Sequence, residues 1–221
     1  MGSRAPFIVK IFFPVYRNQL NIIAGAMLLL LAGACRHPLP LPYYNTAGFT
    51  PQWTSAPQHR IPAFSFTGQH GERVSDTTLS GKIYIANFFF TSCGSICPVM
   101  MKNLLKVQQA FPRDGRIAFL SHTVAPWVDS PPRLKSYSEK YGFDTRWHLV
   151  TGDKASIYRL ARQGYFAEEE PGFYKDSTEF LHTEHVLLID TGGHIRGVYN
   201  GTLPLEIDRL ITDVRQLISY K

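Results

Sequence analysis

The chain has 221 residues, three cysteines, eight histidines and a formal net charge of +6. This length suits one domain with a short leader and is short for two domains. Residues 1–34 carry three basic residues and no acid, which leaves 20 basic and 17 acidic residues for the rest. A charge this small, without a long Lys/Arg run, disfavours nucleic acid as a partner.

The N-terminal segment has the pattern of an export signal. A basic stretch from Arg4 to Arg17 precedes an apolar run of 13 residues from Ile22 to Ala34, shorter than the roughly 20 that span a bilayer. The run ends in small residues and Cys35 follows directly, as in a bacterial lipoprotein signal, whose cysteine carries the lipid. Residues 1–35 are predicted to be such a leader, with an uncleaved anchor as the alternative. Either one predicts a periplasmic domain held at the cell membrane.

Lipidation of Cys35 would leave Cys93 and Cys97 as one local pair. A single short-range disulfide closes too small a loop to act as a structural staple. The pair is therefore predicted to have a chemical role.

Residues 36–60 contain five prolines and no apolar periodicity, which predicts a tether between membrane and domain. The domain is expected over residues 61–221. It begins with a hairpin over 63–75 and a continuously apolar strand over 82–90, as expected of a strand buried on both faces. The elements expected next are a helix over 98–110, a strand over 116–120, a helix over 131–141, a strand over 147–150, a helix over 154–163, a hairpin over 185–199 and a helix over 203–219.

Strands that alternate with helices predict a mainly parallel central sheet, to which the late hairpin adds antiparallel strands. This order is that of an α/β, thioredoxin-like sandwich. In an open α/β sheet, ligand sites lie at the carboxyl ends of the parallel strands. The segment after residue 90 is therefore the expected site.

Cys93 and Cys97 lie in that segment, where the apolar strand ends and a helix begins. A helix N-terminus lowers a thiol pKa through its unpaired N–H groups and positive dipole end, and Pro98 fits just inside such a helix. Helical residues four apart have Cα atoms roughly 6 Å apart, which suits a disulfide or two thiolates on one metal ion. Soft thiolates select Cu(I), and an added imidazole suits Cu(II). The pair is either a metal site completed by a third ligand or a redox pair without metal.

The aromatic strand is followed by the run Thr91-Ser92-Cys93-x-x-x-Cys97-Pro98. This run resembles that of the Sco (SenC/PrrC) family of copper-binding thioredoxin-like proteins, and the resemblance extends over about residues 60–219. It implies that two cysteines and a histidine bind one copper ion. It also implies a role in assembling the copper site of a respiratory cytochrome oxidase, as a copper donor, a thiol reductant, or both. The implied partner is the copper-site subunit of that oxidase or another copper protein.

Two positions depart from the family pattern. Gly94 follows the first cysteine, where the family often has Pro, and Ala125 stands where the family often has an acid. The second departure questions any role of that acid and leaves the three implied ligands in place.

The resemblance points to His182 as the third ligand, because it lies eight residues before Asp190 and precedes Thr183. A residue in the loop before a strand can also lean over the cysteines. His185 is the alternative, although it falls within the strand.

The sequence offers other potential donors for the expected site. His122 ends a strand on the same edge of the sheet and is a candidate to support the ligands, although a histidine at such a place is more often simply exposed. His194 is predicted to be a solvated neighbour of a turn. Met100 and Met101 could supply thioethers, but their helical spacing predicts core packing.

The predicted function is a copper-binding assembly factor, a metallochaperone rather than an enzyme with turnover. The alternatives are an extracytoplasmic thiol–disulfide oxidoreductase and a redox or copper sensor. Thioredoxin-type oxidoreductases carry a cis-proline just before the late strand, and only Pro171 lies between Gly164 and Asp190. This absence favours metal binding over general disulfide exchange.

Overall fold

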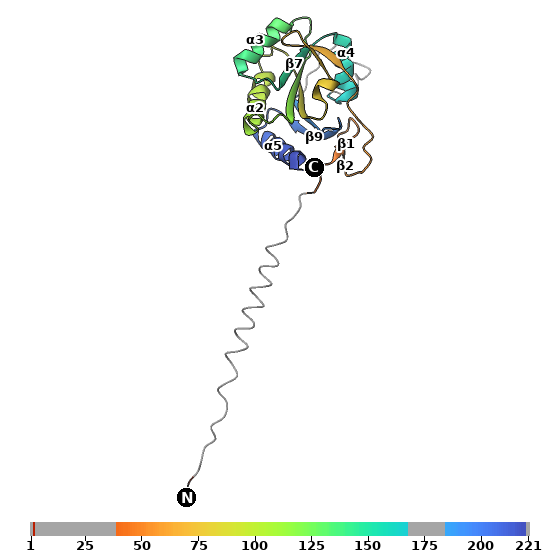
Figure 1. The fold of residues 1–221 in the computed structure, drawn as a ribbon, viewed down its shortest axis with the longest axis vertical. Helices are drawn as coiled ribbons and strands as arrows, with labels where there is room; N and C mark the ends of the chain where they lie inside the picture. The colour runs from red at the N-terminus through yellow and green to blue at the C-terminus, as the bar shows by residue number, and fades with distance from the viewer. Residues whose placement is uncertain (1, 3–38, 168–183, 220–221) are drawn as a thin grey trace. The chain divides into compact units, whose positions relative to one another are not determined.

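The computed structural model describes residue 2, residues 39–167 and residues 184–219 (Figure 1). Residues 40–221 belong to one compact unit and residues 1–39 to another, and the fold described below is that of the first. Cys35 and His182 lie outside the described residues. None of the helices in the described ranges is long and apolar enough to cross a membrane.

The centre of the domain is a seven-stranded sheet with the order β4-β3-β7-β6-β5-β8-β9. The three middle strands β7, β6 and β5 are parallel, and the pairs on both sides of them are antiparallel. The strands are β3 (Ser65–Gly68), β4 (Arg73–Ser75), β5 (Ile83–Phe89), β6 (Ile117–Thr123), β7 (Trp147–Thr151), β8 (His185–Ile189) and β9 (Ile195–Asn200). This is a mixed sheet whose parallel part is confined to its middle.

The sheet separates two apolar cores, because alternate side chains of a strand point to opposite faces. Ile85 and Phe89 of β5 pack with residues of α2 (Ile96–Ala110), α3 (Pro131–Tyr141) and α5 (Pro204–Ser219) on one face, the α2 face. Tyr84 and Phe88 of the same strand pack with α4 (Lys154–Arg159) on the other, the α4 face. Figure 1 shows α2 and α3 on one side of the sheet and α4 on the other.

Local sequence explains where the helices begin and end. Two prolines open α3, where a missing N–H costs little, and Gly142 ends it with a φ of 70°, a left-handed value that glycine adopts without strain. The helix α4 continues into a π-helical turn, η2 (Leu160–Gly164), and a 3-10 helix, η1 (Asp76–Leu79), precedes β5.

The structure confirms the α/β, thioredoxin-like class and the order of the elements that the sequence predicts. All seven residues of β5 are buried, as expected from its continuous apolar run. Several boundaries differ by a few residues. The helix after the cysteines begins at Ile96 instead of residue 98, and β6 continues to Thr123 because three polar residues at its end are also buried.

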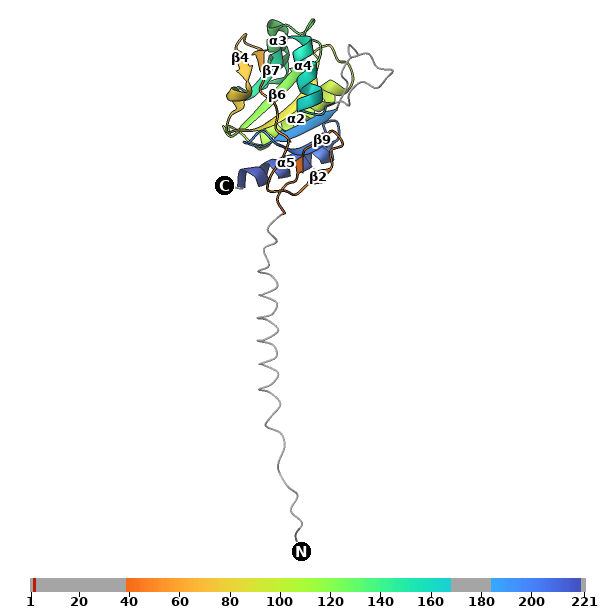
Figure 2. The ribbon, with the colours of Figure 1, turned by 90° about the vertical axis from the view of Figure 1, so that its right-hand side faces the viewer.

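Residues 40–60, within the predicted tether, pack against the domain. They form a small sheet of β1 (Tyr43–Tyr44) and β2 (Pro51–Gln52) that lies next to β9 (Figure 2). Arg196 of β9 donates hydrogen bonds to the carbonyls of Leu41 and Pro42 at 2.5 and 3.0 Å, and its guanidinium lies 4.0 Å from the ring centroid of Tyr43. A segment without apolar periodicity is thus held through two backbone carbonyls and through packed side chains that include Tyr43, Tyr44 and Phe49.

Candidate metal centre

Cys93 and Cys97 lie at the carboxyl end of β5, as the sequence predicts. The Cys loop, residues 91–95, connects β5 to α2, and the amide of Cys93 donates a hydrogen bond to the carbonyl of Phe90 at 3.2 Å. Ser95 precedes α2 without a side-chain cap hydrogen bond. The amides at the start of the helix therefore remain available to the sulfur of Cys93.

The two thiols are free and differ in their surroundings. Cys97 is only 4% exposed and belongs to the core of the α2 face, whereas Cys93 is partly exposed. Cys93 is therefore the sulfur that an incoming ion or thiol meets first.

The pKa values of the two thiols shift in opposite directions. Burial, and then the hydrogen bond with Cys93, raise the pKa of Cys97 to about 12. Burial alone would also raise the pKa of Cys93. Hydrogen bonds from the Ser95 amide and from the Cys97 thiol and amide outweigh burial, so the pKa of Cys93 is lowered. The pair thus combines a thiolate-prone sulfur with a neighbouring thiol that keeps its proton.

A buried carboxylate that the sequence analysis missed lies behind the Cys loop. Asp129 is fully buried and accepts hydrogen bonds from the amide and hydroxyl of Thr91 at 3.1 and 2.5 Å. Arg133 of α3 donates to the hydroxyls of Thr91 and Ser92 at 2.6 and 2.8 Å. Ala125, where the family often has an acid, is itself buried. In the sequence, the only indication of this arrangement is the acidic residue at position 129, just before the predicted helix.

The proposed third ligand, His182, lies outside the described residues, and so does the proposed lipidation site, Cys35. The alternative ligand, His185, opens β8 with its side chain on the same face as Leu187, which is the α4 face. Its ring meets that of Phe49 edge-on, with centroids 5.5 Å apart. His185 therefore points to the opposite face of the sheet from Cys97.

His122 neither supports the cysteines nor is exposed, so both possibilities considered from the sequence are wrong. It is fully buried on the α4 face, in contact with the rings of Phe64, Phe66, Phe88 and Tyr165. Neither ring nitrogen has a hydrogen-bond partner within the described part of the chain. Burial lowers the pKa of His122 to about 3. The ring is thus a neutral member of an aromatic core and lies across the sheet from Cys97.

The other candidate donors have structural places. Met100 and Met101 are fully buried, which confirms core packing, and the amide nitrogen of Asn87 lies 4.0 and 3.9 Å from their sulfurs. His194 is half-buried rather than solvated, because its Nδ1 donates to the carbonyl of His59 at 2.7 Å.

Among the described residues, no group of three His, Cys, Asp or Glu side chains is placed to hold a metal ion. The described part of the site is therefore the cysteine pair. Two sulfurs at a strand–helix junction, one of them partly exposed, are soft donors that fit Cu(I). The same two sulfurs, four residues apart, also suit a local disulfide.

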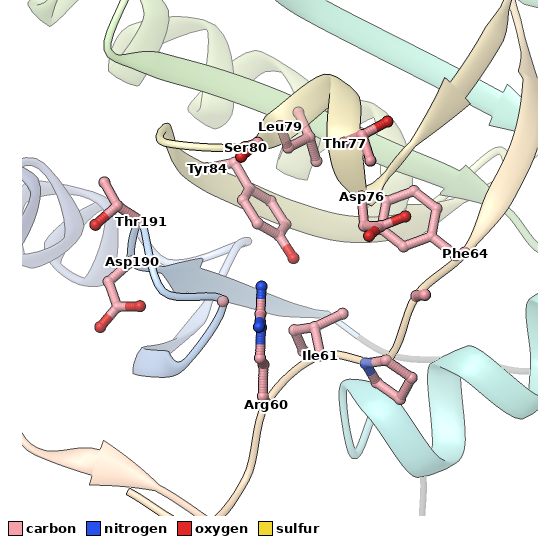
Figure 3. A pocket seen from close by; sticks show the side chains of 13 residues that line it. Arg60, Ile61, Phe64, Asp76, Thr77, Leu79, Ser80, Tyr84, Asp190 and Thr191 are labelled. Carbon is pink, nitrogen blue, oxygen red and sulfur yellow. The ribbon is translucent and has the colours of Figure 1, made fainter.

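A cavity of about 490 Å³ lies at the other end of β5. Figure 3 shows Arg60 pointing toward the hydroxyl of Tyr84, with Asp76 and Asp190 on either side. Neither cysteine lines this cavity. The cysteine chemistry is therefore separate from it.

Comparison with known proteins agrees with this geometry. Residues 53–219 match the family model described as SCO1/SenC. A SCO1/SenC family lipoprotein from Bacillus anthracis is 27% identical with a TM-score of 0.65, over 73% of this chain and 96% of that one. BsSco, described as a Sco family cytochrome c oxidase assembly protein with a disulfide switch, is 26% identical with a TM-score of 0.63, over 74% and 95%. ScoI of Bradyrhizobium japonicum with copper bound shares the fold, with a TM-score of 0.57 and 24% identity over 72% and 99%.

Proposed function

This chain belongs to the SCO1/SenC family, and we propose that it is a membrane-anchored copper-binding assembly factor for the copper site of a respiratory cytochrome oxidase. It would act as a copper donor, as a thiol reductant of that site, or both. The observation that carries the proposal is the pair of free thiols at the carboxyl end of β5, one partly exposed and one buried in the first turn of α2.

Cys93, Cys97 and His182 would hold one copper ion as cargo. The two cysteines supply soft sulfur donors, which favour Cu(I), and an imidazole would extend the site to Cu(II). Cys97 is fixed by core packing on α2, while Cys93 meets the ion at the surface. ScoI, a protein of the same fold, contains copper in its structure, which supports copper as the metal.

The anchor would be lipid on Cys35, with residues 1–35 as the leader, 36–60 as the tether and 61–221 as the copper-binding domain in the periplasm. Support comes from the apolar run that ends in small residues and Cys35. The similar Bacillus anthracis protein is described as a lipoprotein. A partner protein in the same membrane would then be within reach of the cysteines.

A second candidate is a thiol–disulfide oxidoreductase, which the asymmetry of the cysteines favours. In that reaction the Cys93 thiolate attacks a partner disulfide, and the Cys97 sulfur then displaces the partner thiolate from the mixed disulfide. A Cys93–Cys97 disulfide forms, and the partner leaves with two reduced thiols. A redox or copper sensor would use the same states of the pair to alter a contact with its partner.

Metal analysis of the purified full chain, with reductant present, separates these functions. The copper function predicts one Cu(I) per chain that survives dialysis and is lost when both cysteines are replaced by serine. Catalytic reduction of insulin by the metal-free chain, without retained copper, would instead support the oxidoreductase. Stoichiometric copper in the double serine variant would refute the proposed site.

A further inference from the structure

The residues just before Cys93 are held from outside the Cys loop. The amide of Thr91 donates to Oδ2 of Asp129 at 3.1 Å, and its hydroxyl donates to Oδ1 at 2.5 Å. Arg133 donates through Nε to the Thr91 hydroxyl at 2.6 Å and through Nη2 to the Ser92 hydroxyl at 2.8 Å. Asp129, from the segment between β6 and α3, and Arg133, from the first turn of α3, therefore fix both residues that precede Cys93.

Asp129 is itself fixed. It has no exposed surface, and its carboxylate accepts a third hydrogen bond from the hydroxyl of Thr123 at the end of β6. Its amide donates to the carbonyl of Ala125 at 2.9 Å, and Nε of Arg133 lies 3.6 Å from Oδ1. A buried carboxylate with this many donors has little freedom to move, because every alternative position leaves it unpaired.

Cys93, by contrast, has only local hydrogen bonds. The amide of Cys93 donates to the carbonyl of Phe90. Its sulfur lies 3.8 Å from the Ser95 hydroxyl and interacts with the Ser95 amide and with Cys97. Cys97 is placed independently, by the packing of α2 against the sheet. The separation of the two sulfurs therefore depends on how the Cys loop leaves β5.

We propose that Asp129 is a positioning residue for the cysteine pair. Together with Arg133 it holds Thr91 and Ser92, and through them it sets Cys93 at the distance from Cys97 that a shared copper ion or a disulfide requires. Asp129 acts through Thr91 and is not a metal ligand, since hydrogen-bond donors already occupy both of its oxygens. The copper part of this inference rests on the proposed function, whereas the disulfide part does not.

The test uses the full chain and two readouts. The first is Cu(I) affinity in competition with a chromophoric chelator. The second is the equilibrium with glutathione, in which oxidised glutathione converts the two thiols to the Cys93–Cys97 disulfide and leaves as two reduced molecules. Asp129→Asn replaces one acceptor oxygen by an N–H donor, which conflicts with the hydroxyl or amide donors around it. We expect Cu(I) affinity to fall by about 10- to 100-fold and the glutathione equilibrium constant to change on the order of tenfold.

Variants on the other side of the contact keep the test valid if Asp129→Asn folds poorly. Thr91→Val removes the hydroxyl and should change both readouts in the same direction, whereas Thr91→Ser keeps hydroxyl and amide and should behave as the wild type. The matched control is Asp213→Asn on α5, which removes a carboxylate that accepts from the Tyr199 hydroxyl at 2.7 Å. This control should lower thermal stability and leave both readouts unchanged.

The outcomes separate the inference from the proposed function. A wild type without copper affinity, whose glutathione equilibrium still responds to Asp129→Asn and Thr91→Val, would refute the copper function and support the positioning role. Wild-type values of both readouts in these two variants would overturn the positioning role. If Asp213→Asn changes both readouts as much as Asp129→Asn does, at an equal loss of stability, the positioning role would be overturned as well.

Discussion

Cys93 and Cys97 interact through their sulfurs across the first turn of α2, and this interaction contributes to opposite shifts of the two pKa values. The partly exposed sulfur is stabilised as a thiolate, while the buried one keeps its proton. The pair is therefore not symmetric before any metal or disulfide partner arrives.

The metal-free, reduced chain should be alkylated first at Cys93. Iodoacetamide reacts with thiolates, and the lowered pKa of Cys93 together with its exposure favours that sulfur, whereas burial and the raised pKa protect Cys97. Cys97→Ala removes the thiol that interacts with the sulfur of Cys93, so the pKa of Cys93 should rise. The rate at which iodoacetamide alkylates Cys93 near neutral pH should then fall several-fold. Peptide mass spectrometry over a pH series measures this. Equal labelling of both cysteines at neutral pH would contradict the asymmetry.

Replacement of His182 by Ala should weaken Cu(II) binding far more than Cu(I) binding. Two thiolates can hold Cu(I) without further help, but Cu(II) prefers nitrogen or oxygen ligands in addition. His185→Ala is the control, because His185 lies on the α4 face against Phe49. Cu(II) titration followed by the thiolate-to-copper charge-transfer band gives the comparison. If His185→Ala bleaches the band and His182→Ala does not, the assignment of the third ligand is wrong.

The cysteine site and the sheet could be predicted because their signals are local. The apolar run of β5 predicts a buried strand, and Cys93 follows directly where that strand ends. The Asp129–Thr91 contact joins residues 38 apart, so no local pattern marks it. His122 shows another limit. Every residue of β6 is buried, so the strand has no apolar–polar alternation from which to read the face that a side chain occupies.

Loss of the buried imidazole of His122 should make the domain less sensitive to acid. Burial lowers the pKa of His122 from 6.5 to about 3, so between these pH values the unfolded chain binds a proton that the native chain does not. Above about pH 6.5 the protonation of His122 does not lower the free energy of unfolding. As the pH falls below that value the free energy of unfolding decreases, by roughly 3 kcal/mol at pH 4. His122→Leu should remove that part of the pH dependence, and urea unfolding at pH 7 and pH 4 measures it.

The same variant should also be more stable at neutral pH. Neither ring nitrogen of His122 has a hydrogen-bond partner in the described part of the chain, and an unpaired buried polar group costs about 1–3 kcal/mol. His70→Leu, which removes an exposed imidazole, is the control and should leave the pH profile as in the wild type. A steeper acid transition in His122→Leu than in the wild type would contradict the interpretation.

Removal of the Arg196 guanidinium should release residues 40–44 from the domain. The side chain is only 11% exposed, donates to the carbonyls of Leu41 and Pro42, and pairs with Asp190 at 3.0 Å. Arg196→Gln loses the charge and most of these contacts, each of which is worth about 1.5–3 kcal/mol when a charged donor is involved. We expect faster proteolysis near residues 40–44 and a lower melting temperature.

The control for Arg196 is Arg116→Gln, which breaks an exposed ion pair with Asp114. Exposed pairs contribute between about 0 and 1 kcal/mol, so this variant should match the wild type in both measurements. Limited proteolysis with mapping of the cut sites decides the question, because a merely global loss of stability would expose sites throughout the domain. Unchanged cleavage near residues 40–44 in Arg196→Gln would show that β1 and β2 are held on β9 without Arg196, through the packing of Tyr44 and Phe49.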